Sequence, residues 1–292
     1  MPQPIPAMPR PIRRHPGPCL AGLALLALSA CAGSGPAHPF LAAERVQPLD
    51  GPVTLAGPGA ETELDCRLAM QATLDPRIGA RESRSEGPVG VAYHPLDDGA
   101  VRLAAAFRNA SVGARMVPAE GRVVVRMDGD ADRDPALRPA YLLSGYLGFL
   151  GGAGVYGRPL DQGDDLSVPP DPPLIALFQQ ALVADPAQSV YVRRPEAAER
   201  SRVVAGGMEI DGRPAVMIRT VSHQMTEVAP GVVRAGYLSS DYVTEEIYDT
   251  ATGLPLRQQL DLTIDAVDGA ERTRMVHHVS TMTCQAAVAP GA

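Results

Sequence analysis

The chain has 292 residues and a formal net charge of −7, and all 26 of its basic residues are arginine. Without lysine it cannot form a Schiff base, a Ser-Lys acylation pair or a Walker phosphate site. The acidic balance argues against nucleic acid as a partner. The absence of tryptophan, with only 4% aromatic residues, disfavours a carbohydrate site.

The first 30 residues have the form of a secretory signal. Arginines at positions 10, 13 and 14 precede the uncharged stretch CLAGLALLALSA, which ends directly before Cys31. This stretch is shorter than the roughly 20 residues that a membrane-spanning helix needs. We therefore predict a signal peptide over residues 1–30 and export by the general secretory route, with Met8 as an alternative start to Met1.

The end of this leader, Leu28-Ser29-Ala30-Cys31, resembles the lipobox of bacterial lipoproteins. The resemblance implies cleavage before Cys31, a diacylglyceryl thioether on its sulfur and an acyl group on the new amino terminus. Several chains are needed because one acyl chain anchors a protein only marginally. Ala32 stands where aspartate favours inner-membrane retention in such lipoproteins, so we expect an outer-membrane anchor facing the periplasm.

The Gly-, Ala- and Pro-rich residues 31–60 show no apolar period and are expected to form a lipidated tether. Residues 61–292 are expected to form a single antiparallel β domain. Two cysteines remain in it, Cys66 near the first predicted strand and Cys284 near the last. In an oxidising periplasm they most simply pair, so we predict an architectural disulfide; two free buried thiols are the alternative.

Asp-Gly pairs recur along the chain and predict hairpin turns. They occur at residues 50–51, 98–99, 128–129, 211–212 and 268–269. Between residues 254 and 265 apolar and polar side chains alternate, which is typical of an antiparallel strand with one buried face. Further strands are predicted over residues 64–74, 87–93, 101–107, 121–127, 201–210, 213–226, 242–249 and 270–284.

Two segments predict helices. Residues 171–185 have a capping Asp171 followed by two prolines and an apolar face, and residues 134–150 have a weaker pattern interrupted by Pro139 and Gly145. Many long strands with one or two short helices predict a mainly all-β fold, an antiparallel open or broken β-barrel, that is, a half-barrel with a helix in its cavity. A β-sandwich is the alternative.

Gly152, Gly154 and Gly157 have the spacing of a dinucleotide-binding loop. Such a loop must follow a strand and open a helix in a βαβ unit, whereas hairpins surround these glycines. They are interpreted as a bent strand or as a loop that passes close to another backbone.

The metal and catalytic candidates are weak. Alternate aspartates from Asp128 to Asp134 resemble the front of a calcium loop, but Arg133 and Pro139 stand where that loop needs Gly and Glu. The neighbours His277 and His278, like Glu245 and Glu246, point to opposite faces of a strand and cannot act together. We expect no catalytic residue, no metal, no cofactor and no enzymatic activity.

The C-terminal run YDTATGLPLR is similar to the strand-turn-strand of periplasmic half-barrels of the lipoprotein-carrier type. The shared residues are Tyr248, Asp249, Thr252, Gly253, Leu254 and Pro255. A disulfide between early and late strands is also similar to a cell-envelope integrity family of spiral broken barrels. These resemblances imply a half-barrel in the cell envelope.

We therefore expect a lipid-anchored envelope protein that binds or carries an apolar ligand, a lipid or an acyl chain, without catalysis. An envelope scaffold or protein-interaction module with a filled core is the alternative, followed by a secreted hydrolase. Its expected partners are the membrane, a lipid or another envelope protein. The expected ligand-lining residues, which would equally form ordinary core, are Leu174, Leu177, Phe178, Val216, Ile218, Leu256, Leu260, Leu262 and Ile264.

Overall fold

The computed structural model describes residues 46–74, 82–107, 110–119, 121–127, 146–167, 195–227 and 237–287. All of them belong to a unit that extends from residue 44 to residue 292. The predicted signal peptide, Cys31 and the predicted helix over residues 171–185 lie outside the described residues, as do the aspartates from Asp128 to Asp134.

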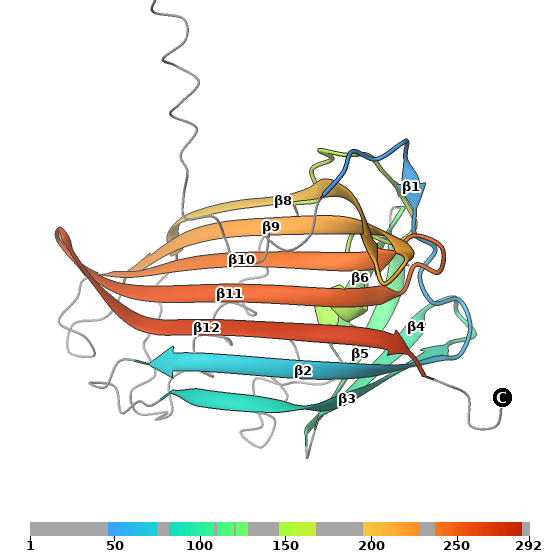
Figure 1. Cartoon of the computed structure of the whole chain (residues 1–292), viewed down its shortest axis with the longest axis horizontal. Helices are drawn as coiled ribbons and strands as arrows, with labels where there is room; N and C mark the ends of the chain where they lie inside the picture. Colours follow the sequence, from blue (N-terminus) through green and yellow to red (C-terminus); the bar gives the residue numbers. More distant parts are fainter. Residues whose placement is uncertain are drawn as a thin grey trace, which may run out of the picture. The chain divides into compact units, whose positions relative to one another are not determined.

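Ten antiparallel strands form one open sheet (Figure 1), in the order β6-β5-β4-β3-β2-β12-β11-β10-β9-β8. The strands are β2 (Thr62–Leu74), β3 (Ser83–Pro95), β4 (Val101–Phe107), β5 (Ala110–Ala119), β6 (Arg122–Met127), β8 (Pro195–Ile210), β9 (Arg213–Glu227), β10 (Tyr237–Asp249), β11 (Pro255–Asp268) and β12 (Glu271–Ala286). Because β6 and β8 do not pair with each other, the sheet is not closed. The predicted all-β open half-barrel is confirmed.

The strand predictions match this sheet except at β5. Its sequence, ASVGARMVPA, is rich in small residues and contains Gly113 and Pro118, which have low strand propensity. It forms a strand because it pairs with β4 on one side and β6 on the other. Pairing with neighbours thus overrides the local preference at this position.

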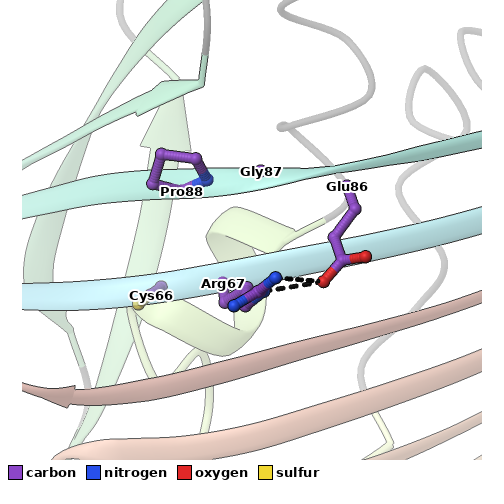
Figure 2. A pocket seen from close by; sticks show the side chains of 5 residues that line it. All are labelled: Cys66, Arg67, Glu86, Gly87 and Pro88. Atoms are coloured by element: carbon purple, nitrogen blue, oxygen red, sulfur yellow. Dashed lines mark hydrogen bonds and ion pairs between the residues drawn. The ribbon is translucent and has the colours of Figure 1, made fainter.

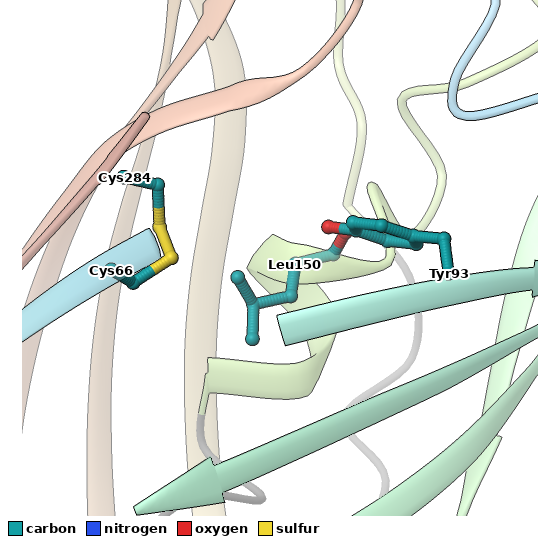
Figure 3. The surroundings of a disulfide bond; sticks show 4 residues. All are labelled: Cys66, Tyr93, Leu150 and Cys284. Carbon is teal, nitrogen blue, oxygen red and sulfur yellow. A yellow bond between two sulfur atoms is a disulfide. The ribbon is translucent and has the colours of Figure 1, made fainter. Parts of the chain in front are cut away.

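The sheet consists of two meanders, β2–β6 and β8–β12, which are joined where β2 pairs with β12. Cys66 and Cys284 lie directly opposite each other on these two strands and form a disulfide that links residues 218 positions apart (Figure 3). The disulfide therefore bonds the first strand of one meander to the last strand of the other.

A short helix over residues 146–150 and the tight turns over residues 151–157 pack against the sheet; we call residues 146–157 the plug. We call the sheet face that carries Leu68, Met282 and Ile218 the inner face. These side chains share one buried cluster with the plug residues, so the plug packs on the inner face. In Figure 3 the disulfide and Tyr93 lie on either side of the plug residue Leu150. Of the predicted helix over residues 134–150, the structure describes only these last residues.

The three glycines of the dinucleotide-loop spacing have positive φ angles, 54° at Gly152, 68° at Gly154 and 79° at Gly157. The Gly154 N–H donates to the Val123 carbonyl over 3.0 Å, and the Gly157 N–H donates to the Leu55 carbonyl over 3.0 Å. This confirms the interpretation of the motif as a loop that passes close to other backbones. The three glycines shape a turn rather than open a helix.

Residues 46–60, which we expected in the tether, pack on the domain instead. Gln47 exchanges two backbone hydrogen bonds of 2.8 Å with Gly207, and β1 (Val53–Thr54) pairs with β7 (Pro159–Leu160). Leu55 is fully buried in the main core. A few apolar residues at irregular spacing attach this segment to the domain. Because their spacing has no period, the sequence did not predict this packing.

Candidate functional site

Strand register arranges the inner face of β2 and β8–β12 in rows that cross the sheet. The first row belongs in part to the core around the plug and contains Leu68, Met282, Gln258, Glu246, Ile218 and Val204. The second contains Met70, Ser280, Leu260, Thr244, Thr220 and Arg202. The third contains Ala72, His278, Leu262, Tyr242, Ser222 and Arg200. The fourth contains Val276, Ile264, Ser240 and Gln224.

The last three rows have an apolar side and a polar side. On β11 and β12, the buried residues Leu260, Leu262, Ile264 and Val276 form one hydrophobic cluster. On β8, β9 and β10, the same rows carry hydroxyl, amide and guanidinium groups, the last from Arg200 and Arg202. The inner face beyond the plug is therefore amphipathic across the strands. This surface is the candidate functional site.

The predicted ligand-lining residues separate into distinct groups. Leu260, Leu262 and Ile264 lie together on the apolar side of the candidate site. Val216 and Ile218 also face inward, but they are buried in the core that contains the plug. Leu174, Leu177 and Phe178 lie outside the described residues.

Leu256 is not part of the candidate site, although its even position suggested that it would be. A β-bulge shifts the register of β10 and β11, because Ile247 pairs with Arg257 while Tyr248 pairs with Pro255. The extra residue breaks the alternation of side chains. Leu256 therefore packs against Met217 and Ile247 in a separate cluster.

A buried ion pair links β8 to β10 at the boundary between the candidate site and the plug. Arg202 Nη2 lies 2.6 Å from Glu246 Oε2, and the two side chains are only 5% and 9% exposed. Arg202 Nη1 also donates to the plug carbonyl of Ala153 over 2.5 Å. Burial opposes the charge of Arg202, yet the Glu246 carboxylate raises the pKa of Arg202 above its ordinary value. Both charges are therefore held in place by specific partners.

The ion pair was not predicted, because Arg202 and Glu246 lie 44 positions apart and nothing in the local sequence connects them. The prediction that Glu245 and Glu246 point to opposite faces is consistent with the register, which sets Glu246 opposite Ile218 and Glu245 opposite Arg219. The only available signal was the alternation of side chains along β8, which places Arg202 on the inner face.

Two tyrosines lie near this ion pair, the fully buried Tyr248 and the partly buried Tyr242. Tyr248 donates hydrogen bonds from its hydroxyl to the Phe149 carbonyl over 3.0 Å and to Glu246 Oε2 over 3.3 Å. Burial, followed by the nearby Glu246 charge, raises the pKa of Tyr242 to about 12. The same two causes raise the pKa of Tyr248 well above its ordinary value. These phenols therefore stay protonated at neutral pH and can donate hydrogen bonds.

Among the described residues of the inner face, three buried side-chain atoms have no hydrogen-bond partner. They are Oε1 of Gln258 and Oγ1 of Thr244, two residues that are 1% exposed, and Oγ of Ser240, which is 9% exposed. An unsatisfied buried polar atom costs about 1–3 kcal/mol. A bound molecule with polar groups would remove this cost by supplying the missing partners.

A separate hollow of about 440 Å³ lies at β2 and β3 (Figure 2). It is lined by Cys66, Arg67, Glu86, Gly87 and Pro88. Figure 2 shows Arg67 and Glu86 reaching toward each other, and Arg67 Nη2 lies 2.7 Å from Glu86 Oε1 with both side chains exposed. Of the five lining residues only Arg67 and Glu86 are charged, and they pair with each other.

The described residues contain no group of three or more His, Cys, Asp or Glu side chains placed to hold a metal ion. His277 Nε2 lies 3.2 Å from Asp261 Oδ1 and is partly exposed. His278 is buried on the inner face, where burial and the neighbouring His277 lower its pKa. The two histidines thus have different surroundings, as expected for adjacent residues of a strand.

No protein-family model and no curated protein matches the sequence. Among solved structures, the YwiB protein of Bacillus subtilis matches with a TM-score of 0.21 and 10% identity, over 78% of this chain and 94% of that one. A LolA-superfamily protein of Nitrosomonas europaea matches with a TM-score of 0.19 and 7% identity, over 79% of this chain and 86% of that one. Neither overlap is close enough to transfer a fold or a function.

Within the ranges that the structure describes, no helix has the length and apolar character needed to cross a bilayer.

Proposed function

We propose that this chain is a lipid-anchored envelope protein that binds or carries an amphipathic lipid or acyl compound in its half-barrel, without catalysis. The observation that supports the proposal is the amphipathic inner face beyond the plug. An apolar wall of Leu260, Leu262 and Ile264 lies in the same rows of the inner face as the hydroxyl and guanidinium groups of β8–β10. A purely structural core has no need for this polar wall.

In this proposal the acyl chain lies against the apolar wall, where each buried methylene contributes about 0.8 kcal/mol. The polar part of the ligand lies toward β9 and β10, within reach of Ser240 and the protonated phenol of Tyr242. The plug fills the other end of the inner face, where Phe149 and Leu150 are fully buried. The ligand then enters from the end of the strands that is remote from the plug.

The proposed anchor is a lipid on Cys31, and the proposed location is the periplasmic side of the outer membrane. This placement would give the half-barrel direct access to membrane lipids. It depends on the lipobox at residues 28–31 and on the signal-like leader before it.

The polar groups of the described inner face support binding better than catalysis. Glu246 is held in its ion pair with Arg202, and the Ser280 hydroxyl receives a hydrogen bond of 2.6 Å from the phenol of Tyr146. A protonated phenol cannot remove the proton of a serine hydroxyl, so Ser280 is not activated as a nucleophile.

An envelope scaffold with a filled core is the second candidate. It is favoured by the dense packing around the plug, where Leu55, Leu68, Leu103 and Phe149 are fully buried. The two functions differ in one respect that can be measured: a carrier needs space for a ligand beside Leu262, and a scaffold has that space filled.

The test is lipid extraction and mass spectrometry of the full chain after expression in a bacterial envelope, for the wild type, Leu262→Trp and Val221→Trp. Val221 lies one register position from Ser222 on the opposite face of β9 and is 44% exposed, so Val221→Trp is the control for a bulky substitution. We expect a stoichiometric lipid in the wild type and in Val221→Trp, and its loss in a folded Leu262→Trp.

The opposite result would support the scaffold. In that case the wild type carries no lipid other than the anchor, and Leu262→Trp overfills the core. The overpacked variant would lose about 1–3 kcal/mol of unfolding free energy relative to Val221→Trp. Denaturant unfolding of the three proteins gives this difference.

A further inference from the structure

Arg200 is a second arginine on the inner face, one row beyond the ion-paired Arg202. The register of β8 and β9 shifts only between Pro195 and Ala197 and between Val204 and Gly206. Arg200 and Arg202 therefore lie on the same side of β8, because alternate residues of a regular strand share a face. Arg200 is half-buried, and it is set opposite Ser222.

The charges around Arg200 are unbalanced. Arg202 and Glu246 neutralise each other in their ion pair. For the Arg200 guanidinium, the described part of the chain provides no carboxylate partner, and its row continues with Ser222 and Tyr242. Burial raises the pKa of Tyr242, whereas Arg200 and Arg202 act in the opposite direction, which puts both guanidinium groups within electrostatic range of this phenol. Among the described residues of the inner face, the positive charge of Arg200 thus remains uncompensated.

The same row carries the apolar wall. From Arg200 on β8 it passes through Ser222 on β9 and Tyr242 on β10 to Leu262 on β11. Neighbouring strands lie about 4.8 Å apart, so the backbones of Arg200 and Leu262 are separated by about 14 Å across the sheet. A charged head group at β8 and an acyl chain on β11 and β12 would therefore belong to one molecule of ordinary lipid size.

We propose that Arg200 binds the head group of an anionic amphiphile, a carboxylate or phosphate attached to an acyl chain. This proposal depends on the proposed function and adds the charge of the ligand. Arginine suits the role because its planar guanidinium can donate two parallel hydrogen bonds to one carboxylate or phosphate. Ser222 and Tyr242 supply further donors beside it.

The test is isothermal titration calorimetry of the purified full chain with three probes: oleate, oleyl alcohol and inorganic phosphate. The variants are Arg200→Gln and, as the control, Arg67→Gln. Arg67 is an exposed arginine on the outer side of β2, where it pairs with Glu86. Both variants lose one positive charge, but only one of them alters the inner face.

We expect the wild type to bind oleate about 10- to 100-fold more tightly than oleyl alcohol. A hydrogen bond to a charged group changes a dissociation constant by about this factor. In Arg200→Gln the preference should disappear, through weaker oleate binding with unchanged binding of the alcohol. Arg67→Gln should behave as the wild type. Inorganic phosphate should bind much more weakly than oleate, because it lacks the acyl chain.

Three results would overturn this inference. If Arg200→Gln keeps the preference for oleate, the amphiphile binds but Arg200 does not hold its head group. If inorganic phosphate binds as tightly as oleate, the site takes a small anion instead of a lipid. If neither oleate nor its alcohol binds to the wild type, the proposed function itself fails.

Discussion

Arg202 and Glu246 show how single residues connect the sheet to the plug. Both side chains are almost completely buried, and Arg202 uses one nitrogen for Glu246 and another for the Ala153 carbonyl. Removing two charges from water is costly, and the attraction between them offsets this cost only when the geometry is good. The pair therefore matters for stability mainly because the loss of either partner would leave the other charge buried without a counterion.

This leads to a prediction for Glu246→Gln. The substitution leaves the Arg202 charge buried without a counterion, so the free energy of unfolding should fall by about 3–5 kcal/mol. Urea unfolding of the variant and the wild type measures the difference. As the control, the double variant Arg202→Met/Glu246→Leu removes both charges and should be more stable than Glu246→Gln. A loss below about 0.5 kcal/mol in Glu246→Gln would show that the ion pair is not buried as described.

At the scale of elements, the plug is held mainly by side chains from strands that are distant in sequence. The hydroxyl of Tyr93 on β3 donates to the Leu150 carbonyl over 2.8 Å, and that of Tyr248 on β10 donates to the Phe149 carbonyl. Tyr146 within the plug donates to Ser280 on β12. Both meanders thus bond to the same short segment.

The plug glycines provide a prediction at this scale. Gly152 and Gly154 both have positive φ, but a Cβ atom on Gly152 would lie 2.2 Å from the Tyr156 ring, whereas on Gly154 its nearest neighbour is Arg202 Nη1 at 3.6 Å. Gly154→Ala should cost about 1–2 kcal/mol through backbone strain alone. Gly152→Ala should cost a further amount of about 1–3 kcal/mol because of the clash.

Chemical denaturation of both alanine variants measures this difference, with Gly154→Ala as the matched control. Equal losses in the two variants would contradict the close contact between Gly152 and Tyr156. The comparison separates the backbone conformation from the packing of the plug.

For the whole molecule, the joint between β2 and β12 unites the two meanders. Its eleven paired positions connect the beginning of the domain with its end, and the disulfide lies within this pairing. Contacts between such distant segments are entropically expensive to form. A covalent bond here restricts the unfolded chain over nearly the whole length of the domain.

Cys66→Ala/Cys284→Ala should therefore lower the free energy of unfolding by about 2–5 kcal/mol. Guanidinium unfolding measures this loss with and without dithiothreitol. The reductant should lower the unfolding free energy of the wild type and leave that of the variant unchanged. The variant is thus the control for other effects of the reductant. An equal effect of dithiothreitol on both proteins would show that the disulfide contributes nothing.

Much of the fold could be predicted from local sequence, because the information is local. Alternation between residues 254 and 265 and the Asp-Gly turns indicated the hairpins of the C-terminal meander, and two leftover cysteines indicated the disulfide that joins β2 to β12. Local patterns could not reveal β5, whose small residues become a strand only by pairing. They also could not reveal the packing of residues 46–60 on the domain.

The candidate site shows the same division. The sequence by itself determined that Leu260, Leu262 and Ile264 share one face, since alternation along a strand requires no partner. Only the tertiary structure decided that Leu256 leaves that face at a bulge, that Arg202 meets Glu246, and that Arg200 shares a row with Leu262. The physical reason is that register between strands depends on contacts across the sheet, and these contacts join residues that local sequence does not connect.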